Sequence, residues 1–475
     1  MKTKDLILPL SALIFTVLFY RQTPGINFLL FTLLYNTVLL FLYPHNRTDK
    51  MWWLYSILTL LSSASVFLVN SPLSVIATLF STIVLSSKSI SPQSSSPLNL
   101  CFGFYSLARS PFSLLAGSFL NTGRLSEKKG SPKPVVIISG ICTSVLVALL
   151  FLVLYRNSNP LFNQYVAGFT FDEINLRLPL FIAFALVFVN GLIYTKTIKK
   201  ASELDVEFSR DIEATKTQTD NLSFDAVVGI SLFALLNIFL LAVNVLDINH
   251  LYVIKQLPAG ITLSQFVHDG VAALVFSIAV AVLLIAWLLR GDLNFNRYSK
   301  ILSYLIYGWL IQNALVIINT MIRNLWYIEE YQLTNLRIFV FIFLILSLTA
   351  LCLTQIKITY KKSAWWLVSA TFNSCLIVLV ATSVINWDKR VTEYNITHAG
   401  ANKPLDVDYL TSELSDANLP ELVKLLNGKK LPQIQRKEIY TKLLYSYRTH
   451  LDTDWQCYNL RTAATRQAML DLQMK

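Results

Sequence analysis

Charged residues are scarce in this chain of 475 amino acids, which separates it from ordinary soluble domains. Asp, Glu, Lys and Arg make up 14% of the residues, against about 25% in soluble domains. Hydrophobic residues make up 54%, and the mean hydropathy is +0.53. The apolar runs are continuous rather than alternating, and most approach the roughly 20 residues that a membrane-spanning helix needs. The sequence therefore predicts an all-α fold, a polytopic transmembrane helical bundle.

The chain also lacks the short motifs of soluble enzymes. It has no GxxxxGK[ST] phosphate loop, no HExxH or Cys/His zinc spacing, and no GxSxG nucleophile turn. Its five histidines share no helical face at ligand spacing, and its five cysteines form no CxxC pair. We therefore expect no cofactor, no metal site and no catalytic residues of the soluble type. Cys101 and Cys457 fall on opposite sides of the membrane in the topology below, so no disulfide is expected between them.

The excess of basic residues does not indicate nucleic-acid binding. The net charge is +12, but most of the Lys and Arg residues lie between apolar runs rather than on one soluble face. The expected partners are the lipid bilayer and a membrane or envelope protein, with no nucleic acid.

Eleven apolar runs are candidate spans. The first follows Lys2 and Lys4 as a signal peptide would, but no small-residue cleavage site comes after it, so it is interpreted as a retained span. The predicted spans are Leu6–Tyr20, Ile26–Tyr43, Met51–Val69, Leu73–Leu85, Val135–Tyr155, Leu178–Tyr194, Phe224–Val245, Phe266–Leu289, Ile301–Ile318, Leu336–Leu353 and Ala364–Ile385.

The distribution of Lys and Arg predicts the orientation of these spans. Both residues are concentrated in the N-terminal segment and in every second connection after it, and the alternate connections are poor in them. Such an excess marks the cytoplasmic side of a cell (inner or plasma) membrane. The N-terminus is therefore expected inside and, because the number of spans is odd, the C-terminal tail outside.

One apolar segment is excluded from the count. Cys101–Leu120 carries Arg109 and Pro111 near its middle, where a charge at bilayer depth is costly, so we expect an interfacial or re-entrant helix on the cytoplasmic face. The predicted regions are residues 1–85 (spans one to four), 86–134 (cytoplasmic loop with this helix), 135–194 (spans five and six), 195–223 (charged cytoplasmic loop), 224–385 (spans seven to eleven) and 386–475 (extracytoplasmic helical tail).

The two polar regions have different expected structures. The loop 195–223 mixes basic and acidic residues, which is typical of a solvated helical hairpin. The tail is predicted to form a small domain of four helices that docks onto the membrane bundle, because four short helices bury only a modest core. Asp406 is expected to cap the first tail helix, and "SDANLPEL" to start the second.

Polar residues inside the spans allow two interpretations. Side-chain amides in membrane helices commonly join neighbouring helices, each contributing about 0.5–2 kcal/mol. The alternative is a polar pathway or substrate cavity between spans seven, nine and eleven. The intramembrane polar candidates are Asn237, Asn244, Gln312, Asn313 and Asn373.

A second group of polar residues is expected at the outer ends of spans seven to ten. The stretch "RNLWYIEEYQLTNLR", Arg323 to Arg337, is interpreted as a short charged connection, and Asp247, His250 and Lys255 as part of another outer loop. Either these residues form a structural network that docks the tail, or the arginines bind an anionic headgroup, peptide or metabolite. The candidate tail- or ligand-binding residues are His268, Asp269, Arg323, Tyr327, Glu330, Tyr331, Thr334, Arg337, Asp406 and Tyr409.

The same residues carry a resemblance to a known family. From Arg323 the chain reads Leu325, Trp326, Tyr327 and then "YQLTNLR". This resembles an Arg, Leu–aromatic–Tyr, Tyr-Gly-Leu-Thr-x-Leu-Arg pattern in bacterial multi-pass membrane proteins catalogued only as a domain of unknown function (the four-one-five-three and four-one-seven-three groups). Gln332 stands where that family has glycine, so this chain lacks the residue on which a tight turn there would depend.

Two further segments extend the resemblance over about Phe224 to Leu460. "GITLSQFVHDG" is similar to a Gly-x-Ser/Thr-x-x-aromatic-Val-Arg-x-Gly segment, with the titratable His268 in place of the usual arginine. "EYNITHAGANKPLDVDYLTSELSDANLPEL" resembles the family's Tyr-Asn … Leu-Asp-x-x-Tyr-Leu-x-x-Leu-Ser-x-Asp-Ala-x-Pro segment. The resemblance implies a multi-pass architecture and no established activity.

Three functional hypotheses remain from the sequence. The first is a non-enzymatic envelope sensor or scaffold whose outer charged cluster docks the tail or a partner. The second is a transporter or lipid-handling protein with a polar cavity between spans seven, nine and eleven, for which "LPAGIT" supplies one candidate helix break. The third is an intramembrane transferase acting on a lipid-linked substrate, with Asp247 or Asp269 as base.

Overall fold

The computed structural model describes most of the chain, and its regular elements are helices. The described residues are 3–124, 177–208, 211–212, 224–254, 263–289, 292–295, 297–400, 403–428, 431–449 and 454–473, with isolated residues between 148 and 164. Within these ranges the chain forms no strand. The predicted all-α membrane fold is therefore confirmed, because several of the helices are also long and apolar enough to cross a bilayer.

The first part of the chain forms an N-terminal bundle. Its core consists of apolar and aromatic side chains from all five helices, including Phe15, Tyr35, Trp52 and Leu192. Neighbouring helices pack antiparallel, because the connections between the first four are short. The helices are α1 (Thr3–Phe19), α2 (Ile26–Leu42), α3 (Lys50–Leu68), α4 (Pro72–Lys88) and α8 (Arg177–Ile193).

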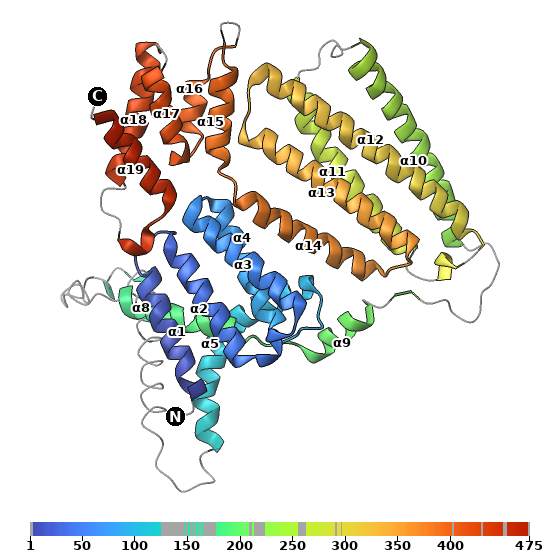
Figure 1. Ribbon diagram of the computed structural model, residues 1–475. Coiled ribbons are helices and arrows are strands. Elements are labelled where there is room, and N and C mark those ends of the chain that lie inside the picture. The colour runs from blue at the N-terminus through green and yellow to red at the C-terminus, as the bar shows by residue number, and fades with distance from the viewer. Residues whose placement is uncertain are drawn as a thin grey trace.

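The second part of the chain forms a C-terminal bundle with a separate core. That core includes Phe233, Ile285, Trp309 and Leu344. A fifth helix, α14 (Ala364–Ser383), packs on this bundle through α13 (Asn335–Thr359) and on the N-terminal bundle through α3 and α4. It therefore joins the two bundles (Figure 1). The helices of the C-terminal bundle are α10 (Phe224–Ile248), α11 (Leu263–Leu288), α12 (Ser299–Tyr331) and α13 (Asn335–Thr359).

Ten of the eleven predicted spans fall on described helices. Six helices, α3 and α10 to α14, are long and apolar enough to cross a membrane, and α1, α2, α4 and α8 are shorter apolar helices. The remaining prediction, Val135–Tyr155, lies largely outside the described residues. Short connections separate consecutive apolar helices, as the sequence indicated. Residues Tyr43–Asp49 lie between α2 and α3, and Val69–Ser71 lie between α3 and α4.

Two predicted outer loops are instead helical. Helix α12 continues without a break to Tyr331, so Arg323 to Tyr331 is not a loop, and only Gln332–Thr334 connects α12 to α13. Helix α10 passes directly into a π-helical segment, Asn249–Ile254, so Asp247 and His250 lie on a helix. Since 33 residues of α12 extend for roughly 50 Å, and the hydrocarbon core is about 30 Å thick, the polar end of this helix continues beyond the apolar layer or the helix tilts.

Two helices lie at the end of the N-terminal bundle away from the helical domain formed by residues 387–473, here called the C-terminal domain. Helix α5 (Ser96–Arg124) packs on the ends of α4 and α8 and continues past them, and α9 (Lys199–Phe208) lies near α14 (Figure 1). Ser110 donates to the carbonyl oxygen of Val187 at 2.6 Å, which fixes α5 against α8. The surface location expected for Cys101–Leu120 stays a prediction.

The C-terminal domain packs around a third core of apolar side chains, which includes Ile338 of α13 as well as Leu410, Leu422 and Ile439. The Asp406 side chain caps α16 by accepting from the backbone N–H of Tyr409 at 3.0 Å, which confirms the predicted cap. One helix of the domain, α15, continues closely from α14 and was not anticipated. The helices are α15 (Trp387–His398), α16 (Val407–Ser412), α17 (Leu419–Gly428), α18 (Gln433–Thr449) and α19 (Leu460–Gln473).

The C-terminal domain and helix α9 lie at opposite ends of the molecule. Figure 1 shows α15 to α19 beside the α12–α13 turn and above the start of α2, whereas α9 and the N-terminus lie at the other end of the bundles. The domain is therefore placed to contact both bundles at one end.

Candidate functional site

The charged cluster singled out in the sequence divides into two arginine sites at the end of α12. Arg323 forms an ion pair with Asp247 of α10. The two side chains are only 10% and 12% exposed, so the pair is largely removed from solvent. A charge buried in this way is stable when it is paired, and removal of either partner is costly. The pair therefore fastens the polar ends of α10 and α12 to each other.

Arg337, in the first turn of α13, bonds to the backbone rather than to a carboxylate. Its guanidinium donates to the carbonyl oxygen of Tyr331 at 2.8 Å and to that of Gln332. The carbon of the guanidinium lies 3.9 Å from the centre of the Tyr327 ring, in a cation–π arrangement. A cation at this position satisfies carbonyl groups that the end of α12 leaves without helical partners. Thr334 caps the start of α13.

Gln332 forms the turn between these arginines in a backbone conformation that normally requires glycine. Its φ is 68° and its ψ is 175°, a region that is essentially restricted to glycine and costs other residues about 1–3 kcal/mol. The turn expected from the family's glycine is thus made by glutamine. The side chain provides one compensation, because its amide donates to the carbonyl oxygen of Pro404 at 2.6 Å.

Polar side chains of the C-terminal domain form hydrogen bonds to the backbone of this turn. Asn395 of α15 accepts from the N–H of Leu333 at 2.8 Å and donates to the carbonyl oxygen of Leu333 at 2.9 Å. The Tyr409 hydroxyl accepts from the N–H of Asn335 at 3.0 Å. Because both bonds of Asn395 go to a single residue, they fix the register of α15 on the turn.

Asp388 connects the α12–α13 turn to the interior of the C-terminal domain. Its carboxylate accepts from the side-chain amide of Asn335 at 2.7 Å and from the N–H of Ser415 at 3.0 Å. The Ser415 hydroxyl also donates to it. From the other side, Lys403 donates to the carbonyl oxygens of Ile328, at 3.1 Å, and of Glu329. We call the residues 328–335 the turn region, since every one of these bonds except those of Ser415 ends there.

A second attachment joins the C-terminal domain to the N-terminal bundle. Residues 454–461, here called the C-terminal clip, lie against the α1–α2 turn. The amide of Gln22 donates to Asp454 at 2.8 Å, and the N–H of Ile26 donates to the carbonyl oxygen of Tyr458 at 2.9 Å. Arg461 donates to the carbonyl oxygen of Asn70, in the α3–α4 turn, at 2.8 Å.

The closest approach within this attachment is at Gly25. A Cβ atom on Gly25 would lie 2.5 Å from the backbone carbonyl carbon and oxygen of Cys457. The Cys457 thiol accepts from the N–H of Thr23 at 3.1 Å and bonds to Gln22 at 2.8 Å. Cys457 is buried, so backbone and side chain of the clip are both in contact with the α1–α2 turn.

The other predicted site residues are dispersed around the turn region. Glu330 and Tyr331 are exposed, and the Tyr331 ring lies 5.3 Å from that of Tyr327. Tyr409 lies on α16 and its hydroxyl is bonded to Asn335 of α13. Burial at this contact raises the pKa of the Tyr409 hydroxyl. His268 and Asp269 lie on α11, but their side chains are outside the described residues.

The intramembrane amides connect helices. The Gln312 amide donates to Asn237 at 2.6 Å, and the Asn237 amide donates to the carbonyl oxygen of Leu305 at 2.8 Å. Asn244 donates to the carbonyl oxygen of Gln312 at 3.2 Å. These bonds join α10 to α12 and support the structural interpretation of the amides. Asn313 instead donates to the carbonyl oxygen of Trp309 within α12, and Asn373 of α14 accepts from Tyr55 of α3 at 2.8 Å.

Two structurally important residues were not singled out by sequence analysis. The sequence contained a clue to Asn395, because this residue is the Asn of the Tyr-Asn pair in the C-terminal segment that resembles the family. Asp205 had none, since it lay in a run of mixed charges that reads as solvated. The structure buries Asp205, which accepts from the N–H of Ser95 at 2.7 Å and from the indole of Trp365, and so fastens α9 to α5 and α14.

The described side chains contain no metal-binding cluster, as no group of three or more His, Cys, Asp and Glu residues among them could hold an ion. Arg323 and Arg337, on either side of the turn region, are engaged with a carboxylate and with backbone carbonyls.

A comparison of the chain with models of protein families gives a match. The model of a family described as "Domain of unknown function (DUF4153)" matches residues 10–425. This match begins in α1, well upstream of the segment from Phe224 onward that carried the resemblance. The comparison with curated proteins and that with solved structures found no match.

Proposed function

The chain belongs to the DUF4153 family, and from its geometry we propose that this integral membrane protein is a non-enzymatic envelope scaffold. In this proposal the bundles hold the C-terminal helical domain at the membrane surface, and the domain presents a surface to a protein partner. The observation that carries the proposal is the double attachment of the domain, at the turn region of the C-terminal bundle and at the α1–α2 turn of the N-terminal bundle.

The arginines support this proposal over the binding of an anionic ligand. Arg323 is paired with Asp247, and Arg337 is bonded to two carbonyl oxygens and stacked on Tyr327. An anion would have to displace the bonds that these guanidinium groups already form. Both arginines thereby stabilise the ends of helices on which the C-terminal domain rests.

Helix α18 offers the partner surface of this scaffold. On this helix Leu444 is 55% exposed and Ile434 is 73% exposed, and the neighbouring Tyr445 is 70% exposed. Exposed apolar side chains on one helix are a common basis for helix-mediated contacts with another protein. We place this surface outside the cytoplasm, following the distribution of Lys and Arg between the spans.

Affinity capture from membranes tests the scaffold. The full-length chain, Leu444→Glu and the matched control Thr441→Glu, also an exposed position of α18, are purified through a common tag. We expect one or more envelope proteins to be enriched with wild type and with the Thr441 variant, and to be lost with Leu444→Glu. Identical protein sets from all three chains would count against the proposed surface.

A second variant separates loss of the surface from loss of docking. Asn395→Ala removes both side-chain bonds to Leu333 but leaves α18 unchanged. In the scaffold proposal this variant binds the partner more weakly, because the turn region holds the domain less firmly while the C-terminal clip still attaches it. Full retention of the partner by Asn395→Ala would show that docking to the bundle is not needed for binding.

A further inference from the structure

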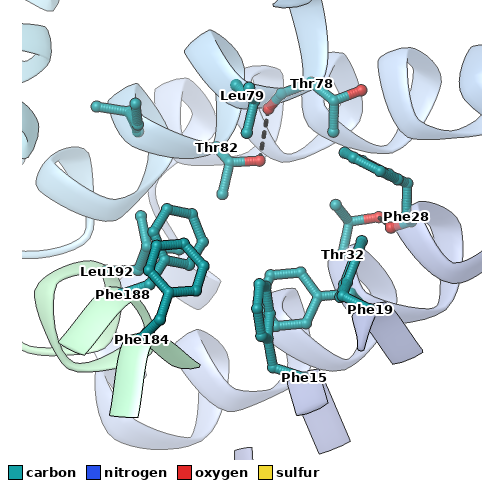
Figure 2. Close-up of a pocket in the computed structure, with 12 residues that line it drawn as sticks. Phe15, Phe19, Phe28, Thr32, Thr78, Leu79, Thr82, Phe184, Phe188 and Leu192 are labelled. Carbon is teal, nitrogen blue, oxygen red and sulfur yellow. Dashed lines mark hydrogen bonds between the residues drawn. The ribbon is translucent and has the colours of Figure 1, made fainter. Parts of the chain in front are cut away.

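A cavity in the N-terminal bundle is unrelated to the docking sites and is lined mainly by phenylalanine. It has a volume of about 310 Å³ and lies between α1, α2, α4 and α8. This is about twice the ~150 Å³ of an engineered cavity that accommodates benzene. Figure 2 shows aromatic rings from α1 and α8 opposite the threonines of α4 across the open space. Its six phenylalanines are Phe15, Phe19, Phe28, Phe31, Phe184 and Phe188.

The hydroxyl groups in the wall are already satisfied, so the cavity offers an apolar surface. Thr82 donates to the carbonyl oxygen of Thr78 at 2.6 Å, as Figure 2 shows, and Thr78 donates to that of Ser74 at 2.8 Å. Thr32 bonds to its own helix and, at 2.7 Å, to Ser63 of α3. A ligand with hydrogen-bonding groups would therefore find few partners in this cavity. A hydrocarbon chain forms no hydrogen bonds and would lose none by entering it.

The cavity is open on one side. Its inner wall is buried, since Phe15 is 7% and Thr82 is 6% exposed. At its mouth, Phe184 is 51% and Leu79 is 41% exposed. In a protein whose bundle crosses a bilayer, exposed phenylalanine and leucine side chains in the middle of apolar helices face lipid.

The position of the cavity along the helices corresponds to the depth of lipid chains. Thr78 and Thr82 follow the first residue of α4, Pro72, by six and ten residues, which at about 1.5 Å per residue is roughly 9–15 Å. Half of the hydrocarbon core is about 15 Å. The cavity thus lies at the level of the acyl chains in the leaflet nearest the α1–α2 turn.

From the lining, the opening and the depth, we propose that this cavity binds one acyl chain of a membrane phospholipid. The chain enters between Leu79 and Phe184 and packs against the phenylalanine rings, while the headgroup stays at the membrane surface. Because hydrocarbon is equally available in the bilayer, selectivity comes from close packing in the cavity rather than from the hydrophobic effect.

A phospholipid fits better than a free fatty acid. None of the twelve lining residues is charged, so a carboxylate drawn to this depth would have no counterion among them. A phospholipid avoids that cost because its polar group remains outside. The bilayer also surrounds the mouth with phospholipid chains at all times.

Photolabelling with a defined lipid tests the site. Full-length protein is reconstituted in phosphatidylglycerol vesicles that contain phosphatidylglycerol with a diazirine at the end of one acyl chain. We expect peptide mapping to find label on Phe15, Phe188 or neighbouring residues of the inner wall. Label at exposed positions of α10, such as Ile238 and Phe239 (61% and 64% exposed), reports ordinary contact with lipid.

Two variants reduce the space without removing a bond between helices. Thr82→Phe places a ring in the cavity, and Leu79→Trp narrows its mouth. Thr37→Phe, at an exposed position of the same bundle outside the lining, is the matched control. We expect label on the inner wall to be lost in the first two and kept in Thr37→Phe, with label on α10 unchanged throughout.

Other occupants give different results. A diazirine derivative of palmitic acid should label the inner wall less than the phospholipid does, and preferential labelling by the fatty acid would overturn the proposal. A benzoylphenylalanine placed at position 79 should give an adduct with the mass of a phospholipid. Cross-linking there only to another segment of this chain or to a second copy would also overturn it, as would inner-wall label that persists in both Thr82→Phe and Leu79→Trp.

Discussion

At the scale of single residues, two arginines of one sequence motif have different structural roles. Arg323 of α12 neutralises a buried carboxylate on the neighbouring helix α10. Arg337 of α13 donates to a carbonyl oxygen at the end of the preceding helix, α12. A lysine could supply the charge at either position, but it has no planar group to donate to two carbonyls and stack on Tyr327 at once. The motif therefore specifies the geometry of the α12 end and not merely a positive charge.

The ion pair between Arg323 and Asp247 gives the first prediction. Asp247→Leu leaves the arginine without its carboxylate, so we expect it to destabilise the protein by about 3–5 kcal/mol. Adding Arg323→Met to this variant should recover most of that loss, because two apolar side chains can pack where the pair was. Thermal unfolding of both variants in detergent micelles measures the effect. A double variant as unstable as the single one would contradict the explanation.

Gln332 gives the second prediction, in which strain opposes a hydrogen bond. Gln332→Gly relieves a backbone cost of about 1–3 kcal/mol and loses one side-chain bond that contributes about 0.5–1.5 kcal/mol. We expect a net stabilisation of roughly 1 kcal/mol. The matched variant Gln332→Ala keeps the strain and loses the bond to Pro404, so it should be destabilised by about 1 kcal/mol. Equal melting temperatures for the two variants would show that the backbone is not strained.

Lys442 gives a prediction of pH dependence in the C-terminal domain. Burial lowers the pKa of its ammonium to about 8 from the ordinary 10.5, although the carboxylates of Asp416 and Asp388 oppose the shift. Between these values the unfolded chain binds more protons than the folded one, so the stability of the domain rises with pH. The gain is at most about 3 kcal/mol.

Hydrogen exchange measures this effect. The amides of α16 and α18, corrected for the intrinsic rate at each pH, should become better protected as the pH rises from 7.5 to 9.5, since Lys442 donates to the carbonyls of Leu410 and Leu414. The variant Lys442→Met should lack the dependence. If the two chains respond to pH alike, another group is responsible.

At the scale of helices, the sequence predicted most apolar segments but misjudged where helices end. The predicted spans end with the apolar runs, at Ile318 and Val245. The structure continues α12 to Tyr331 and α10, through its π segment, to Ile254. Hydropathy marks where a helix leaves the hydrocarbon, whereas the helix itself ends only where its backbone bonds end, here at Gln332. No glycine or proline interrupts either extension.

The attachment of the C-terminal clip gives a prediction at this scale. Gly25→Ala places a methyl group 2.5 Å from the carbonyl of Cys457, so the clip must move away from the α1–α2 turn. Gly428→Ala is the matched control, because nothing lies within 4 Å of its Cβ position. The amide of Ile26 donates to the carbonyl oxygen of Tyr458, so it should exchange with solvent deuterium faster in Gly25→Ala than in the unchanged chain or the control. Unchanged exchange of this amide in the Gly25 variant would mean that the turn and the clip are not in contact.

At the scale of the whole molecule, two bundles are joined in two ways. Helix α14 packs on both of them, and the C-terminal domain is bonded to turns of both at one end. The domain also shares its apolar core with Ile338 of α13. Loss of one attachment should therefore loosen the domain without releasing it, which is the reason for testing the attachments separately.

The topology gives the last prediction. Single cysteines at Glu203, on α9, and at Glu413, beside α16, lie at opposite ends of the molecule (Figure 1). In oriented membranes of a chain whose native cysteines are replaced, we expect an impermeant maleimide to label Glu413→Cys from outside and Glu203→Cys only after the membrane is opened. Labelling of both from the same side would contradict the predicted orientation.

Composition and the local pattern of residues were sufficient to predict several features of this protein. These are the helical class, ten described apolar helices, the Asp406 cap and the family, because each depends on hydropathy, capping chemistry or motif spacing within a short segment. The sequence also drew attention to Arg323 and Arg337, since charge is rare in such a chain.

Only the tertiary structure decided what these residues contact. Three of these contacts join segments that are far apart in the chain. They are the pairing of Arg323 with Asp247, the bonds of Asn395 to the turn region and the burial of Asp205. The phenylalanine-lined cavity likewise arises from four helices that come together. Hydropathy reports whether a side chain prefers an apolar environment, but it carries no information on which helix supplies that environment, and this is why the partners appeared only with the fold.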